Sequence, residues 1–285
     1  MVKIAKDIYE SIAGYEKYSS PKTKGEQLYP IDLIFTLDNE KEYYSPKDSA
    51  GIPIRLYKSV GAKYNPTRVA AFGLANWNKY KSQGNEESKV EFLKVVNWFM
   101  QNNAEGKWVY NFDWGELKAG WISCMAQGEA ISILTRGYWL TAEKQYLNLA
   151  VKAAEYLFLN IDAGGVKSSL SDGSVFFEEY PSANVKHVLN GFLYAVIGLI
   201  ELYNETEIEW IGCLLSDLKN TLEKNIHLWD SGYWSYYDLD NIHTDKRKNL
   251  STIAYHSLHI SQLRFIGDYF KSELIINTAS KWPKY

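Results

Sequence analysis

The sequence predicts a mainly α-helical protein whose helical hairpins stack side by side into a toroid, with short β-hairpins and loops lining a cleft at one end. From Thr67 onward the apolar residues follow the helical period. Short links between the expected helices alternate with longer loops rich in glycine and aromatic residues. The chain has no strict internal repeat, which argues against a solenoid. Functional loops of such a stack gather at one end of it.

Residues 1–66 form an irregular N-terminal segment, and residues 67–285 form the expected toroid. Glycine and proline recur throughout the first part, with short β pieces expected at residues 32–37 and 52–57. The run Asn65-Pro66-Thr67 then provides a helix start signal, because proline is tolerated in the first helical turn.

Eight helices are expected beyond this signal, joined by short links and three longer loops. The helices are residues 67–82, 87–103, 120–139, 142–160, 184–204, 207–228, 250–267 and 269–282. Residues 174–177 resemble a strand, and residues 229–239 resemble a β-hairpin with Asp230-Ser231-Gly232 as its turn.

The composition excludes several classes of protein. Hydrophobic residues make up 46% and charged residues 23%, as in soluble globular proteins, and the net charge of −3 argues against nucleic acid as a partner. No run of about 18 apolar residues is present, so we expect no membrane span. The first residues lack the apolar centre of a signal peptide, so we expect a cytoplasmic protein. Two cysteines form no disulfide framework.

Aromatic residues make up 15% of the chain, with 10 tryptophans and 22 tyrosines. These side chains combine a flat apolar face with a polar edge, which suits the faces and hydroxyls of sugars. We expect most of them in the core and a minority in a groove. The aromatic residues of 229–239 suit a sugar platform, although cross-strand pairs would also explain them.

The segment 255–263 carries polar side chains with helical spacing. Tyr255, His259 and Gln262 fall on one helix face. A polar stripe inside an aromatic-rich helical protein indicates a cavity that holds something polar; an amphipathic helix with satisfied polar groups is the alternative. His256 and His259 are spaced like metal ligands, but no third ligand stands out, so we predict no metal site. The chain also lacks nucleotide-binding and zinc motifs, so no cofactor is expected.

Two further segments carry candidate site residues. Tyr180 precedes Pro181 and is therefore held extended, which would point Glu179 and Tyr180 to opposite sides. A carboxylate beside a phenol is a candidate acid/base pair, and a charged turn is the alternative. In the helix after Trp121, Gln127 and Gly128 are costly for helix formation, which a close helix contact or an approaching ligand would explain.

Taken together, these segments resemble the D-glucuronyl C5-epimerases that act on heparosan-type polysaccharides, over residues 64–270. The matching residues run in the family's order: Trp121 with Met125-Ala126-Gln127-Gly128 and Ala130-Ile131-Ser132, Glu179-Tyr180-Pro181, Val188-Leu189-Asn190-Gly191-Phe192, Tyr237-Asp238-Leu239, and Tyr255-His256 with His259 and Gln262-Leu263.

The resemblance implies an incomplete (α/α) toroid with a cleft at one end. It implies a catalytic group made of Glu179, Tyr180, Tyr237 and Tyr255. Trp121, Gln127, Asn190, His256, His259 and Gln262 become candidate substrate-binding residues. The expected activity inverts C5 of D-glucuronate to L-iduronate in a heparosan-like polysaccharide, without cofactor or metal, and the expected partner is that acidic polysaccharide or an oligosaccharide.

Two departures from the family bear on this expectation. The animal enzymes carry a β-rich domain where this chain has only residues 82–89, so the cleft should be more open and the dimer contacts of that domain absent, although a homodimer is still possible. Asp240 replaces the arginine that follows the family's Tyr-Asp-Leu motif. Lys246, Arg247 or Lys248 could bind the uronate carboxylate instead, and we take Arg247 as the candidate.

The chemistry leaves three other functions open. A polysaccharide lyase passes through the same carbanion and expels the 4-O substituent. A glycoside hydrolase would use Glu179 with a second carboxylate such as Asp113 or Asp238. A non-catalytic glycan-binding toroid would explain Asp240.

Overall fold

The computed structural model of this chain describes residues 18–21, 27–240 and 248–284. The first half contains α2 (Ile34–Asp38), α3 (Glu40–Tyr44), β1 (Arg55–Tyr57), β2 (Gly61–Lys63), α4 (Pro66–Gln83), α5 (Glu86–Gln101), α6 (Cys124–Thr141) and α7 (Lys144–Phe158). The second half contains η1 (Ile161–Ala163), β3 (Lys167–Ser169), β4 (Val175–Phe177), α8 (Leu189–Thr206), α9 (Glu209–Asn225), η2 (Ile226–Trp229), α11 (Ile253–Phe270), α12 (Glu273–Lys281) and η3 (Trp282–Lys284).

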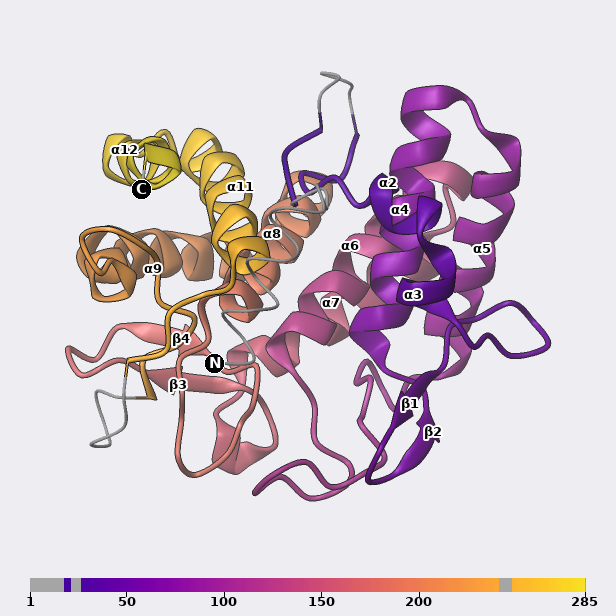
Figure 1. Cartoon of the computed structure of the whole chain (residues 1–285), viewed down its shortest axis with the longest axis horizontal. Helices are drawn as coiled ribbons and strands as arrows, with labels where there is room; N and C mark the ends of the chain where they lie inside the picture. The colour runs from indigo at the N-terminus through magenta and orange to yellow at the C-terminus, as the bar shows by residue number, and fades with distance from the viewer. Residues whose placement is uncertain (1–17, 22–26, 241–247, 285) are drawn as a thin grey trace.

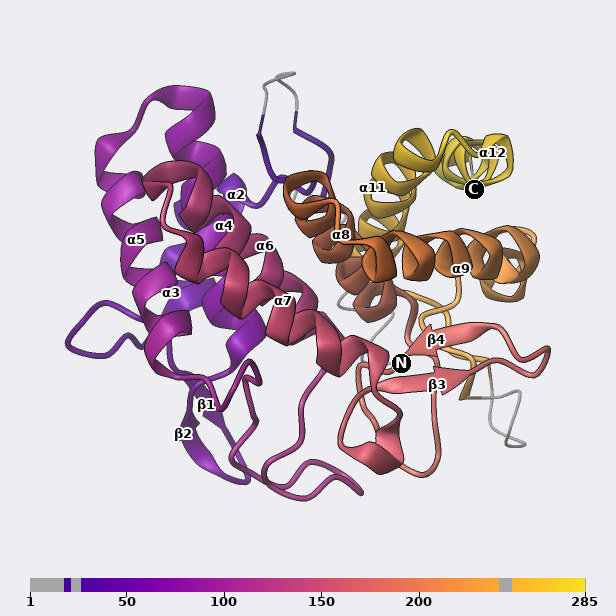
Figure 2. The same cartoon turned by 180° about the vertical axis from the view of Figure 1, so that it is seen from behind.

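The long helices form an incomplete (α/α) toroid, as the sequence predicts. The inner helices α4, α6, α8 and α11 contact one another in succession, and α5, α7, α9 and α12 each contact the inner helix that precedes them. Figures 1 and 2 show this arc with α4 and α11 at its two ends.

The short strands and long loops lie on one side of the helices, below them in both views, with β1 and β2 beneath the α4 end of the arc and β3 and β4 beneath the α9 end (Figures 1 and 2). Strands β1 and β2 form one antiparallel pair, with Arg55 opposite Lys63, and β3 and β4 form another, with Lys167 opposite Phe177. The loop between α5 and α6 runs beside β1 and β2. This side therefore carries the segments in which the candidate residues lie.

Side-chain caps start two inner helices on this side. Asn65 accepts a hydrogen bond from the backbone N–H of Arg68 at the start of α4, with Pro66 in the first turn. Thr252 accepts one from the backbone N–H of Tyr255 at the start of α11. The second cap fixes Tyr255 in the first turn of its helix.

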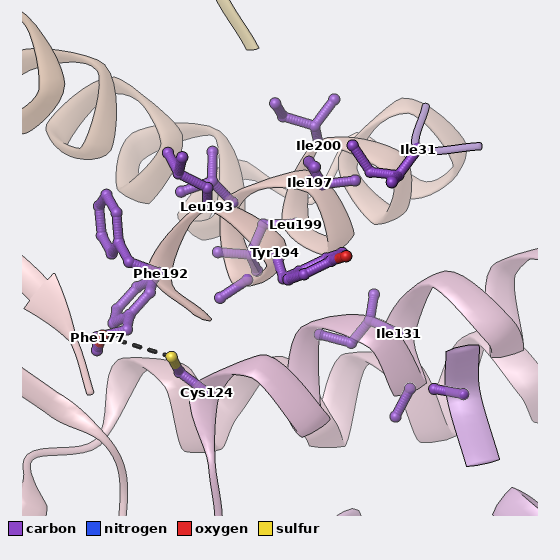
Figure 3. Close-up of a cluster of buried hydrophobic side chains, with 14 of the residues drawn as sticks. Ile31, Cys124, Ile131, Phe177, Phe192, Leu193, Tyr194, Ile197, Leu199 and Ile200 are labelled. Carbon is purple, nitrogen blue, oxygen red and sulfur yellow. Dashed lines mark hydrogen bonds between the residues drawn. The ribbon is translucent and has the colours of Figure 1, made fainter. Parts of the chain in front are cut away.

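The core lies between α6 and α8. Figure 3 shows Cys124 and Ile131 of α6 beside the buried side chains of α8, with the Cys124 Sγ 3.4 Å from the carbonyl oxygen of Phe177. A Cβ on Gly128 would lie 2.5 Å from the Cα of Ala195, and one on Gly198 would collide with the backbone of Gly128. Gly128 thus serves a close helix contact, not a ligand.

Three expectations about local structure are wrong. The strand expected over residues 32–37 is replaced by helix α2 (Ile34–Asp38), because the Asp32 carboxylate accepts the Ile34 N–H and starts a turn. The helices expected from residues 120 and 184 begin later, at Cys124 and Leu189.

The third is the hairpin over residues 229–239, which is reduced to one bridge between Asp230 and Ser235. Its turn forms as expected, since the Gly232 N–H donates to the Asp230 carboxylate. Tyr236 then pairs with Leu250 instead of continuing the hairpin. The indole of Trp234 donates to the Ser251 carbonyl, so this segment is bonded to the start of α11.

The N-terminal segment packs into the same core as the toroid. Tyr29, Ile31, Tyr44 and Ile52 belong to the large buried cluster, and the Asn78 side chain of α4 bonds to the backbone of the first two. The division at residue 66 stays a prediction. Over the described ranges, none of the helices has the length and apolar character needed to cross a membrane.

Candidate active site

Glu179 lies where the chain bends after strand β4. The strand ends at Phe177, and residues 179–180 form a bend, not extended backbone. The Glu179 carboxylate lies against the first turn of α8, where Asn190 Nδ2 is 3.4 Å from Oε2. A Cβ on Gly191 would lie 2.7 Å from the same oxygen, so glycine makes room for the carboxylate.

The Glu178 carboxylate forms its hydrogen bonds on the opposite side of this bend. Its carboxylate accepts from the Ser168 hydroxyl at 2.6 Å and from the His187 backbone N–H at 3.0 Å, and it lies 2.6 Å from His187 Nδ1. The prediction that Glu179 and Tyr180 point to opposite sides is wrong, because the bend turns Glu179 toward Tyr180.

The four predicted catalytic side chains lie next to one another. The Tyr180 side chain lies beside the Glu179 carboxylate, Tyr237 lies beside Tyr180, and Tyr255 lies beside Tyr237. The rings of Tyr237 and Tyr255 are 4.9 Å apart at 63°. The structure thus brings together residues from the bend after β4, from the loop before α11 and from α11 itself.

Tyr237 is fixed by its backbone. Its N–H donates to the Asn249 carbonyl at 2.7 Å, and its own carbonyl accepts from the Leu189 N–H at the start of α8. The ring is therefore held between α8 and α11, next to Glu179 on one side and Tyr255 on the other.

Burial raises the pKa of all four side chains. It raises the pKa of Glu179 to about 7. Burial together with the charge of Glu179 raises the pKa of Tyr180 and Tyr237 well above the ordinary value. Loss of hydration, with the charge of Glu179, raises the pKa of Tyr255 to about 12. All three tyrosines are protonated at neutral pH, and Glu179 is the group that changes charge there.

Trp121 provides an aromatic wall beside this group. Its ring is half-buried and lies 6.1 Å from the Tyr180 ring. It stacks on Tyr110 at 4.0 Å, and its indole N–H donates to the Phe112 carbonyl. The indole is thus held in place beside Tyr180. Tyr110 was missed at the sequence level, where only the aromatic density of its loop pointed to it.

Gln127 does not contact the cleft, and its predicted substrate-binding role is wrong. The side chain is fully buried. Its amide accepts from the Trp108 N–H at 3.1 Å and donates to the carbonyls of Gly106 and Ala153. These bonds hold the loop after α5 against α6 and α7, and they use both ends of the amide.

His256 and His259 are both buried, and the Ser235 hydroxyl contacts the Nδ1 atoms of both at 2.8 and 3.1 Å. The His256 ring stacks on Trp234 at 3.8 Å. Burial lowers the pKa of His259 to about 3, so its ring is neutral. These contacts bond the segment before α11 to the helix that carries Tyr255, and direct contact of the two histidines with substrate stays a prediction.

Gln262 and Asn190 act as positioning residues. Both side chains are buried. Gln262 Nε2 donates to the Asn190 carbonyl at 3.1 Å, and the Asn190 amide reaches Glu179. They connect α11 and α8 to the buried carboxylate, and their contact with substrate stays a prediction. Of the predicted polar stripe, only Tyr255 is exposed, at 36%.

The candidate carboxylate-binding residue Arg247 lies outside the described residues, as does Lys246. The Lys248 ammonium lies 5.0 Å from the centre of the Tyr236 ring. Within the described ranges, no group of three or more His, Cys, Asp or Glu side chains could hold a metal ion.

The fold is that of the (α/α) toroid proteins. It matches a GH76 alpha-mannanase of Bacteroides thetaiotaomicron with a TM-score of 0.56 and 14% identity, over 85% of this chain and 64% of that one. It matches a cellobiose 2-epimerase of Bacillus thermoamylovorans with a TM-score of 0.54 and 15% identity, over 83% and 66% of the two chains.

Within that class, the chain belongs to the family described as D-glucuronyl C5-epimerase C-terminus, whose model matches residues 101–284. A D-glucuronyl C5-epimerase of Caenorhabditis elegans is 32% identical over 223 residues, which are 72% of this chain and 36% of that protein. An uncharacterized protein of Methanocaldococcus jannaschii is 26% identical over 61% of this chain and 56% of its own length. The chain thus spans about a third to a half of these relatives.

Proposed function

We propose that the protein is a carbohydrate epimerase that inverts C5 of a glucuronate residue within a heparosan-like polysaccharide. The observation that carries this proposal is the series of neighbouring side chains from Glu179 through Tyr180 and Tyr237 to Tyr255. Membership of the D-glucuronyl C5-epimerase family supports the choice of substrate.

Inversion at C5 needs a base on one face of the sugar ring and an acid on the other. The protonated tyrosines are suited to the acid role, because a phenol gives up a proton when a carbanion forms beside it. A free phenolate is disfavoured here, since burial raises the tyrosine pKa values. The base must therefore be coupled to a group that takes up the proton near neutral pH.

Glu179 fills that need. When Tyr180 takes the proton from C5, its own proton passes to the carboxylate of Glu179, whose pKa is about 7. Tyr237 or Tyr255 then donates a proton to the opposite face of C5. One C–H bond breaks and one forms. Proton transfer along the series from Glu179 restores the starting charges, so the net reaction requires no redox partner.

The substrate carboxylate needs its own stabilisation, because negative charge builds on it in the transition state. Arg247 is our candidate for this contact. Trp121 would support an apolar sugar face, since its ring is fixed by Tyr110 and stands beside Tyr180.

Analysis of the products tests the proposal against a polysaccharide lyase, which passes through the same carbanion, and against a glycoside hydrolase, which cleaves the polymer. We expect heparosan incubated with the protein to gain L-iduronate, with no loss of chain length. A UV-absorbing unsaturated product would identify a lyase instead. New reducing ends without UV absorbance would identify a hydrolase, and an unchanged polymer would leave a glycan-binding role.

A further inference from the structure

A cavity of about 300 Å³ lies between strand β2, the end of α5 and the loop after it. Its lining combines the aromatic rings of Tyr64, Trp98 and Phe112 with Lys63 and the amides of Asn102 and Asn111. A volume of this size is at the lower end of pockets that hold small ligands. None of the four proposed catalytic residues lines it, so it is a separate site.

The cavity wall offers both surfaces that a sugar requires. The rings of Tyr64 and Trp98 lie 5.5 Å apart, and Tyr64 is 39% exposed. Trp98 is only 8% exposed, yet its indole N–H has no hydrogen-bond partner within the described part of the chain. A buried donor without a partner is costly, and a sugar hydroxyl would satisfy it.

Positive charge collects beside this wall without a counter-ion. Arg55 and Lys63 are direct partners across β1 and β2, where opposed like charges are unfavourable. Arg68 lies close enough for Arg55 to help lower the Arg68 pKa, and its buried Nε has no partner. Over residues 18–21, 27–240 and 248–284, none of these three cations has a carboxylate within ion-pair distance. An anion would offset this repulsion.

The cavity shares an aromatic wall with the proposed active site. Phe112 lines the cavity, packs on Tyr57 at 4.7 Å, and lies 6.4 Å from Trp121. Trp121 in turn lies 6.1 Å from Tyr180. A polymer lying along these rings would reach from one site to the other. Figures 1 and 2 place β1 and β2 on the same lower side of the helices as β3 and β4, beneath the α4 end of the arc.

We propose that this cavity is a second sugar-binding subsite, which holds a uronate residue of the same polysaccharide other than the one that reacts. Lys63 and Arg55 bind its carboxylate, and Tyr64, Trp98 and Phe112 contact the ring. This inference rests on the proposed function only for the identity of the polymer.

The test compares variants that each remove one positive charge from the β1–β2 hairpin. Lys63→Gln and Arg55→Gln remove the proposed carboxylate partners, and Lys58→Gln removes the same charge at the exposed turn between β1 and β2. Trp98→Phe removes the indole donor and keeps an aromatic ring. Binding is measured with immobilised heparosan, and C5 exchange with heparosan and with a heparosan disaccharide. Thermal unfolding of each variant shows that it is folded.

We expect Lys63→Gln and Arg55→Gln each to raise Kd and KM for heparosan about tenfold, which corresponds to the loss of about 1.4 kcal/mol of binding free energy. Turnover at saturation and exchange on the disaccharide should stay unchanged, and Trp98→Phe should weaken binding less. Lys58→Gln should behave like the wild type.

Equal weakening by Lys58→Gln and Lys63→Gln would mean an unspecific positive field and would overturn the subsite. Unchanged binding in folded Lys63→Gln and Arg55→Gln would overturn it as well, while C5 exchange by the wild type would leave the proposed function standing. If the wild type binds heparosan without C5 exchange, the function fails, and the binding comparison still decides the subsite.

Discussion

At the scale of single residues, the account depends on Tyr180. Its hydroxyl stands between the Glu179 carboxylate and Tyr237, so it is the group through which a proton from C5 would enter the series. A structural role, in which the hydroxyl only fixes the bend after β4, would need the same contacts. Removing the hydroxyl while keeping the ring separates the two roles.

We predict that Tyr180→Phe lowers the rate of C5 exchange by about 10²–10⁴, the usual contribution of a positioned acid or base. The ring and its contact with Trp121 remain, so stability should fall by much less than the ~3–5 kcal/mol lost when a whole aromatic side chain is truncated. Exchange kinetics and urea unfolding of the same variant check both statements. Wild-type exchange in a destabilised Tyr180→Phe would assign the hydroxyl to structure.

Glu179 makes a prediction about pH. The carboxylate must be ionised to accept the Tyr180 proton, and its pKa is about 7. We expect kcat/KM to fall about tenfold per unit as the pH drops below that value. An anionic substrate should raise the corresponding pKa seen in kcat. A kcat/KM profile that is flat between pH 5 and about 8 would show that Glu179 is not the titrating group.

The buried carboxylate of Glu179 should also lower the stability of the folded protein when it is ionised. The folded-state pKa of Glu179 is raised from 4.5 to about 7, so stability is lost as the pH rises through that window, by on the order of 3 kcal/mol. Glu179→Gln should therefore be more stable than the wild type at pH 8 and inactive. Asn190→Ala is the matched control, because it removes the amide that bonds the carboxylate and leaves the charge.

At the scale of elements, the distance between α6 and α8 sets the position of Glu179. Gly128 and Gly198 allow the two helix backbones to touch, and the first turn of α8 then contacts the carboxylate through Asn190 and Gly191. The sequence predicted that these two helices exist, because their apolar period is long, but it placed their starts four and five residues too early, because neither start has a side-chain cap.

Gly198→Ala should destabilise the protein by about 1–3 kcal/mol, because the added methyl would meet the Gly128 backbone closer than 3.0 Å. Gly212→Ala is the control on the outer helix α9. Its methyl would meet the ring of Tyr203, a half-buried side chain that can move. Chemical denaturation of both variants gives the comparison, and equal midpoints would mean that the α6–α8 contact is not close-packed.

The sequence could not distinguish residues that bind a substrate from residues that position the substrate-binding side chains. His259 and Gln262 share a helix face with Tyr255, but α8, Ser235 and Trp282 cover all of that face except its first turn. The same holds for Gln127, since the backbone groups that it bonds come from the loop after α5 and from helix α7. The order of the sequence motifs indicated that Glu179 and the three tyrosines belong to one site. The periodicity of the side chains could not indicate this, because these residues are far apart in the chain.

At the scale of the whole molecule, the N-terminal segment and the toroid share one core. The sequence suggested an irregular segment up to residue 66, because glycine and proline interrupt it. The structure buries Tyr29, Ile31, Tyr44 and Ile52 from that segment against α4. Trp77 also donates its indole N–H to the Gln27 carbonyl.

We expect a fragment of residues 67–285 to lose cooperative unfolding. Burying each of those four side chains contributes about 1.5–3 kcal/mol, and their sum is comparable to the ~5–15 kcal/mol stability of a typical domain. Asn78 would also lose its three bonds to residues 29 and 31. A fragment that unfolds at the full chain's denaturant midpoint would establish residues 67–285 as an independent domain.

The central claim is that the Glu179 and tyrosine series moves a proton on and off C5 of a uronate. Deuterium NMR of heparosan incubated with the protein in D₂O measures this directly, because the exchangeable hydroxyls of Tyr180, Tyr237 and Tyr255 carry solvent deuterium to the carbon. We expect deuterium at C5 of both glucuronate and newly formed iduronate, with the chain length unchanged, and a much slower signal with Tyr180→Phe. Iduronate that forms without deuterium at C5, or a polymer that is cleaved and carries none, would contradict the account.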